Sequence, residues 1–83
     1  EMFAYQLNNG LNALALNKLT EARNSLERAN ETVPTSIAFL RLGDIAVRQN
    51  LREEAIRYYS TAAKAGGDVA EEAKQKLAKL TEQ

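Results

Sequence analysis

The sequence predicts an all-α protein, and three observations carry that prediction. The 83 residues include 14 alanines and 11 leucines but only three valines and three isoleucines. Alanine and leucine are strong helix formers, whereas β-branched residues favour strands. Helix breakers are few and regularly spaced, at Asn17, Pro34, Asn50 and the Gly66-Gly67 pair, and no stretch alternates apolar and polar residues as a half-buried strand does. We therefore expect helices joined by short turns.

The breakers divide the chain into five helical segments, expected at about residues 2–16, 20–32, 36–49, 52–65 and 68–81. Pro34 ends the second segment because proline lacks a backbone N–H and restricts the residue before it. Thr35 or Ser36 can cap the third segment, and Asp68 with Glu71 forms a predicted capping pair for the fifth. The asparagines between paired helices tolerate the left-handed backbone that a tight turn needs.

An internal repeat organises these segments. At an offset of 33 residues, identities fall mainly at small and turn residues; the pairs are Leu7/Leu40, Gly10/Gly43, Ala13/Ala46, Asn17/Asn50, Glu21/Glu54, Ala22/Ala55 and Ala29/Ala62. Two helices joined by three or four residues lie antiparallel, and their axes approach closely only where side chains are small. The pattern predicts two stacked helical hairpins closed by a final helix, because one hairpin cannot bury its apolar face alone.

The second repeat resembles a tetratricopeptide repeat, a family with two antiparallel helices in about 34 residues. The matching residues are Phe39, Leu42, Gly43, Ala46, Ala55, Tyr59 and Ala62, with Gly67 where proline usually stands. The resemblance implies a right-handed α-α superhelix of antiparallel hairpins with five helices. It makes residues 1–83 a single domain, with repeat one at about 3–35, repeat two at about 36–67 and a capping helix at about 68–82. We expect this domain to be a piece of a longer, bacterial protein.

The first repeat fits the family pattern less closely. Its matching residues are Gly10, Ala22, Leu26, Ala29 and Pro34, whereas Gln6 and Asn9 stand where the pattern has tryptophan and leucine. A shift of the first helix by one residue places Leu7, Gly10, Leu11 and Leu14 on the pattern instead. In the shifted register these leucines belong to the core. In the unshifted register they form an exposed apolar stripe that could receive a preceding repeat, a second copy of the chain or a ligand.

Composition excludes several classes of function. The chain has no histidine and no cysteine, so imidazole and thiol catalysis, disulfides and the usual zinc ligands are absent. We expect no enzyme activity, no cofactor and no metal. Eleven basic residues balance eleven acidic ones, which argues against nucleic-acid binding, since phosphate contacts normally need a basic excess. No apolar run approaches the roughly 20 residues that span a bilayer.

The family resemblance also implies a binding surface. Tetratricopeptide repeats bind proteins or peptides in a concave groove lined by the first helix of each repeat, and the corresponding residues here are Leu7, Asn8, Leu11, Arg41, Asp44 and Arg48. The two arginines lie two helical turns apart with the aspartate between them. One interpretation is a basic groove floor that meets an acidic partner. The other is a charge ladder on a solvated helix face.

These observations favour a protein-interaction module that scaffolds a larger assembly. A structural or oligomerising segment, joined to a second copy through its first helix, is the main alternative. A nucleic-acid binder that uses Arg41, Arg48, Arg52 and Arg57 is a weaker one. No motif identifies the partner or the compartment.

Overall fold

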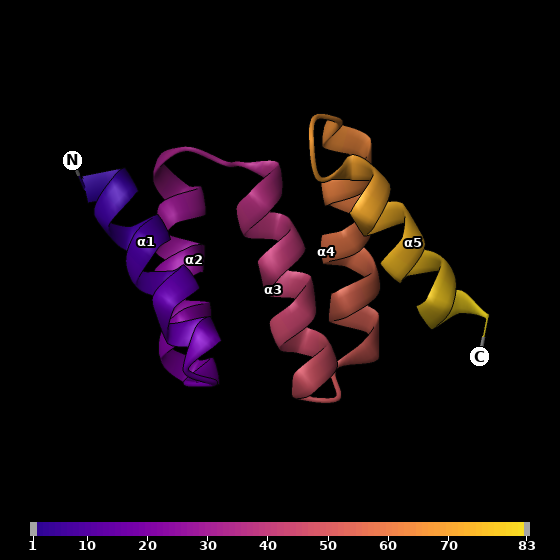
Figure 1. Ribbon diagram of the computed structural model, residues 1–83, viewed down its shortest axis with the longest axis horizontal. Coiled ribbons are helices and arrows are strands. Elements are labelled where there is room, and N and C mark those ends of the chain that lie inside the picture. The colour runs from indigo at the N-terminus through magenta and orange to yellow at the C-terminus, as the bar shows by residue number, and fades with distance from the viewer. Residues whose placement is uncertain (1, 83) are drawn as a thin grey trace.

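The computed structural model describes residues 2–82 and contains five helices within them. They are α1 (Met2–Ala15), α2 (Leu19–Thr32), α3 (Ser36–Arg48), α4 (Arg52–Ala65) and α5 (Ala70–Thr81). Figure 1 shows the helices side by side along the longest dimension of the molecule, each pair joined by a short turn. The predicted all-α fold of helical hairpins is confirmed. The predicted segments agree with these bounds to within two residues.

The caps of the helices are partly as predicted. The Thr35 hydroxyl accepts a hydrogen bond from the Ala38 N–H at 3.3 Å and caps α3. The predicted capping pair at the start of α5 is wrong. Residues 68–69 form a turn, the N-cap is Val69, and no side chain accepts a hydrogen bond there. The preceding glycines, with φ of 76° and 84°, lead the chain into this turn, so the helix begins two residues later than Asp68.

The two turns within the hairpins have the same structure. Asn17 and Asn50 adopt left-handed conformations, with φ of 60° and 64°, as predicted. Each turn closes with the same pair of backbone hydrogen bonds of the Schellman type: Asn17 N–H to Leu14 O, Lys18 N–H to Ala13 O, Asn50 N–H to Val47 O, and Leu51 N–H to Ala46 O. Because donors and acceptors correspond at an offset of 33 residues, the repeat exists in the backbone as well as in the sequence.

Glycines set the close approach of the helices in each hairpin. A Cβ atom added at Gly43 would lie 2.5 Å from the Tyr59 ring, and one added at Gly10 would lie 2.7 Å from the Leu26 side chain. These pairs correspond at an offset of 33 residues, so the first helix has the unshifted register. Both helix pairs approach through a residue without a side chain, as the small-residue pattern predicts.

The core consists of two apolar clusters. One joins the first hairpin to α3, and its buried members are Ala13, Leu14, Ala22, Leu26, Ala38, Leu42 and Ile45. The other joins the second hairpin to α5, and its buried members are Leu40, Ala46, Ala55, Tyr59, Ala62 and Ala73. Each hairpin therefore completes its core only by contact with the next element along the chain. This is the arrangement expected of stacked helical repeats.

The expectation that the unshifted register would expose the α1 leucines is wrong. Leu14 is buried, and Leu7 and Leu11 are half-buried against the first core cluster. The cluster against which they pack includes Ala38, Leu42 and Ile45 of α3 as well as residues of the first hairpin.

Candidate binding groove

Two adjoining hollows lie on either side of α3. The α3–α5 hollow has a volume of about 500 Å³ and is lined by Arg41, Asp44, Val47, Arg48, Tyr59, Lys76, Lys79 and Leu80. The α1–α3 hollow has a volume of about 350 Å³ and is lined by Leu11, Leu14, Ala15, Ile37, Arg41, Asp44 and Arg48. Because three residues of α3 line both hollows, we treat them together and call them the groove.

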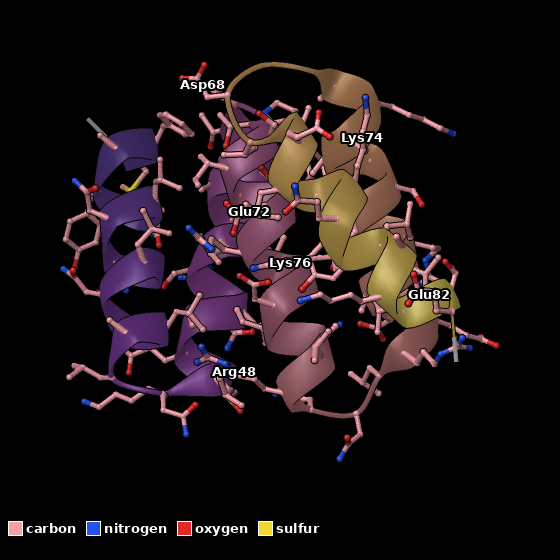
Figure 2. The ribbon with its side chains drawn as sticks, turned by 45° about the vertical axis from the view of Figure 1, so that its right-hand side comes forward. Arg48, Asp68, Glu72, Lys74, Lys76 and Glu82 are labelled. Carbon is pink, nitrogen blue, oxygen red and sulfur yellow. The ribbon has the colours of Figure 1, made fainter. Side chains whose placement is uncertain are left out.

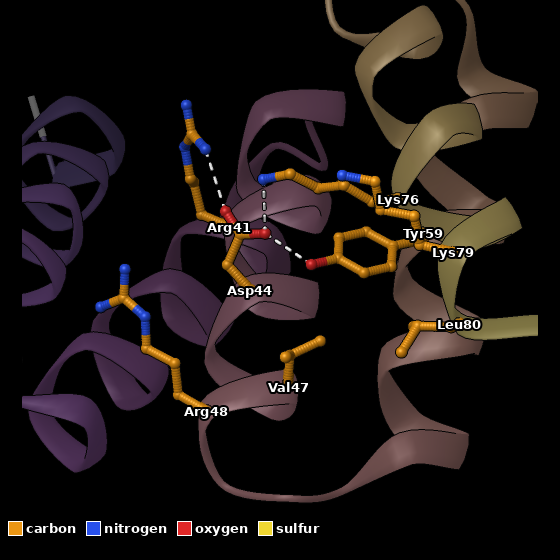
Figure 3. A pocket seen from close by; sticks show the side chains of 8 residues that line it. All are labelled: Arg41, Asp44, Val47, Arg48, Tyr59, Lys76, Lys79 and Leu80. Carbon is orange, nitrogen blue, oxygen red and sulfur yellow. Dashed lines mark hydrogen bonds and ion pairs between the residues drawn. The ribbon is translucent and has the colours of Figure 1, made fainter. Parts of the chain in front are cut away.

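The Asp44 carboxylate is the centre of the groove (Figure 3). It accepts hydrogen bonds from the Tyr59 hydroxyl at 2.5 Å, from Lys76 Nζ at 2.8 Å and from Arg41 Nη1 at 2.9 Å. Its side chain is 13% exposed. These bonds join three helices, since the donors come from α4, α5 and α3 itself. The carboxylate therefore ties the last helix to the second hairpin.

The electrostatics of this centre follow from its hydrogen bonds. Burial alone would raise the pKa of Asp44, but the hydrogen bonds from Lys76, Tyr59 and Arg41 outweigh burial and hold that pKa below its usual value. Burial and the adjacent carboxylate raise the pKa of Tyr59 well above its usual value. Tyr59 therefore remains a hydrogen-bond donor, and Asp44 remains ionised, at neutral pH.

The predicted charge ladder along α3 is present only in its first half. Arg41 pairs with Asp44, but Arg48 turns away from that carboxylate toward α1 (Figure 3). Its Nη1 donates to the Leu14 carbonyl oxygen and to Asn17 Oδ1, both at 3.4 Å. The oxygens of Asp44 already have three donors, so the second arginine finds acceptors at the end of α1 instead.

Four cationic side chains and one carboxylate line the α3–α5 hollow. Two of the cations are neutralised, because Arg41 and Lys76 pair with Asp44 and also with Glu72 at 3.7 and 3.1 Å. Glu72 and Lys76 both reach from α5 toward α3 (Figure 2). Across residues 2–82, neither Arg48 nor Lys79 forms an ion pair with an acidic side chain. The hollow therefore carries a local positive charge in a chain of zero net charge.

The structure brings four of the six predicted site residues into the groove. Leu11, Arg41, Asp44 and Arg48 line it. Leu7 lines neither hollow and packs against the first core cluster. Asn8 is exposed on α1 and also lines neither hollow.

Sequence reasoning missed the contributions of α4 and α5 to the groove. From the sequence, neither Tyr59 nor the lysines of α5 were assigned to the binding surface. Tyr59 and Lys76 lie 15 and 32 residues from Asp44 along the chain. No local spacing could reveal these contacts. The available signal was the repeat itself, because a further helix stacked on the second hairpin lies close to the helices of that hairpin.

The arginines named for nucleic-acid binding do not gather at one place. Arg41 and Arg48 line the groove, whereas Arg57 lines a separate hollow at the start of α4. Arg52 lines that separate hollow and also a small one that it shares with Val47 and Leu80 at the edge of the groove. Glu53 and Glu54 also line the hollow at the start of α4, so the charge of that hollow is balanced. A continuous basic stripe, such as a phosphate backbone needs, is not found over the described residues.

The groove offers charged side chains and apolar walls. Within residues 2–82, no group of acidic side chains is placed to hold a metal ion. None of the helices in that range is long and apolar enough to cross a membrane. Comparisons with protein-family models, curated proteins and solved structures found no match. The fold and the groove together define the class: a small all-α protein of stacked helical hairpins.

Proposed function

We propose that the chain is a non-catalytic, tetratricopeptide-like interaction module whose groove binds an acidic segment of another protein. Support comes from the 33-residue repeat in turn geometry and in helix packing. Further support comes from the position of the hollows beside α3, the first helix of the second repeat. In this proposal the module scaffolds a larger assembly by holding one segment of a partner.

The charge of the α3–α5 hollow is the observation that carries the proposal. Its one carboxylate already accepts hydrogen bonds from three donors, which occupy most of its roughly four acceptor sites. Arg48 retains donors, since its contacts to α1 are long, at 3.4 Å, and Lys79 is exposed on the α5 side of the same hollow. An arginine fork and a lysine ammonium bind carboxylates with charge-assisted hydrogen bonds.

Selection of binders from a random peptide library tests this proposal without assuming a sequence. We expect the selected peptides to be enriched in aspartate and glutamate, because their carboxylates complement the positive charges of Arg48 and Lys79. Their binding is expected to weaken as salt rises, since exposed charges are screened. Selection of basic or neutral peptides would contradict the proposal, as would no enrichment at all.

Charge reversal locates the binding site. The double variant Arg48→Glu/Lys79→Glu places two carboxylates in the α3–α5 hollow, and we expect it to lose the acidic peptides. The matched control is Arg28→Glu/Lys74→Glu, which changes net charge equally at two exposed residues of α2 and α5; Lys74 extends away from α3 (Figure 2). If both double variants bind equally well, the groove is not the site.

An oligomerising role is the second candidate, because one observation favours it. Residues 2–17 contain no charged side chain, and Met2, Tyr5 and Leu16 on or just beyond α1 are 65–68% exposed. Exposed apolar residues on an uncharged helix are typical of a protein interface. Sedimentation of the isolated chain tests this: self-association that Tyr5→Lys abolishes supports it, and a monomer at millimolar concentration contradicts it.

A further inference from the structure

The two halves of the groove differ in chemistry. The α1–α3 hollow has apolar walls made by Leu11, Leu14, Ala15 and Ile37. In contrast, α5 contributes two lysines as well as Leu80 to the α3–α5 hollow, so charged residues other than the shared ones of α3 line only that hollow. Between the two halves lie Arg41, Asp44 and Arg48 of α3, which line both hollows.

We propose that the groove recognises a two-part motif, an apolar residue followed or preceded at a fixed spacing by acidic residues in an extended peptide. The apolar residue enters the α1–α3 hollow, and the carboxylates meet Lys79 in the α3–α5 hollow and Arg48 between the two hollows. This inference rests on the proposed function and adds to it the second element of the ligand. Charge alone would select any acidic segment, whereas the apolar hollow selects among them.

The geometry sets the spacing within the motif. Both hollows adjoin α3 from opposite sides, so their centres are separated by about one helix diameter, roughly 10–12 Å. An extended peptide advances about 3.3 Å per residue. The apolar residue and the nearest carboxylate are therefore about three positions apart. An adjacent pair would be too short to occupy both hollows.

The hollow is open, so an apolar residue would be only partly buried. Full burial of a leucine-sized side chain corresponds to more than a tenfold gain in affinity. We expect about a tenfold gain for the leucine. That gain requires the carboxylates to be bound at the same time, because the shallow hollow holds no apolar residue by itself.

A series of capped, fluorescein-labelled peptides tests the motif by fluorescence anisotropy. Each peptide has two glutamates in a glycine-serine background. A leucine stands three positions before them, three positions after them, or directly beside them, and in the reference peptide it is replaced by serine. We expect one of the two peptides with the three-residue spacing to bind about tenfold more tightly than the serine reference. The adjacent peptide is expected to bind like the reference.

A substitution that obstructs the α1–α3 hollow tests whether the leucine binds there, and a substitution elsewhere on α1 is its matched control. Ala15 is exposed and lines this hollow, whereas Ala4 is exposed on the same helix and lines neither hollow. Because both sites are exposed, neither substitution disturbs the core. We expect Ala15→Phe to remove the gain from leucine while leaving the serine reference unaffected, and Ala4→Phe to change neither.

The outcomes distinguish this inference from the proposed function. If the acidic peptides bind but leucine adds nothing at any spacing, the two-part motif is wrong and acidic recognition stands. The motif is also wrong if leucine helps equally at every spacing or if the gain survives Ala15→Phe. If none of the glutamate peptides binds, or if glutamine versions bind as well, both the motif and the proposed function are wrong.

Discussion

Replacement of Asp44 by asparagine separates a structural role of this residue from a role in ligand binding. The substitution keeps the shape of the side chain and removes its charge. The Tyr59 hydroxyl can still donate to the amide oxygen, but Lys76 and Arg41 lose the anion that they share. Because these contacts join α5 to the second hairpin, we expect the loss to appear as reduced stability without any ligand present.

The magnitude follows from the exposure of the partners. Hydrogen bonds to charged groups stabilise proteins by roughly 1.5–3 kcal/mol, and exposed ion pairs by about 0.2–1 kcal/mol. The Asp44 side chain is 13% exposed and that of Lys76 is 34% exposed, so this pair lies between the two cases. We expect Asp44→Asn to lower the free energy of unfolding by about 1–3 kcal/mol.

Urea unfolding followed by circular dichroism measures this change. With a denaturant slope near 1 kcal/mol per molar, the midpoint is expected to fall by about 1–3 M. The control is Asp68→Asn, which removes the same charge from an exposed residue and is expected to leave the midpoint within about 0.5 M. In the Lys76→Met background, Asp44→Asn is expected to cost less, because the two residues interact. Equal midpoints for Asp44→Asn and the wild type would refute the structural role.

Three further predictions concern the same features. Ionised Asp44 contributes fully to the free energy of unfolding above its ordinary pKa of about 4, and this contribution is lost as the pH falls through its lower folded-state pKa. The urea midpoints of the wild type and of Asp44→Asn are therefore expected to converge in acid. A difference between the two midpoints that stays constant with pH would contradict this. Gly43→Ala is expected to destabilise the fold by about 1–2 kcal/mol in the same assay, since overlap with the Tyr59 ring exceeds the gain of about 1 kcal/mol in helix propensity; a stabilised variant would show that the hairpin can open freely. Asn50→Ala is expected to cost about 1 kcal/mol at its positive φ, while Asn50→Gly is tolerated, and equal thermal stability of the two variants would refute the role of that turn.

The helices and the hairpin packing could be predicted from the sequence because their causes are local or periodic. Asn17 and Asn50 mark turns through a conformation that few residues tolerate. Gly10 and Gly43 recur at the repeat offset because each faces a large residue of the partner helix. The start of α5 was misplaced, since the two preceding glycines shape the chain more strongly than the side chain of Asp68 does.

Only the groove residues on α1 and α3 could be predicted from the sequence. The family resemblance located Arg41, Asp44 and Arg48, which all line the groove. It could not assign their partners, because Lys76 reaches Asp44 from α5 and Arg48 turns to the end of α1. Such contacts depend on how helices distant in sequence stack, and that is set by the packing of the whole chain.

Amide chemical-shift mapping with a selected peptide tests directly whether the groove is the binding site. The labelled chain is titrated with a peptide taken from the random-library selection, and the shifted amides are assigned. We expect the shifts to cluster on α3 and α5 around Arg48 and Lys79, to extend to the end of α1, and to vanish in the Arg48→Glu/Lys79→Glu variant. Shifts confined to α2 and α4, or unchanged in that variant, would contradict the assignment of the groove as the binding site.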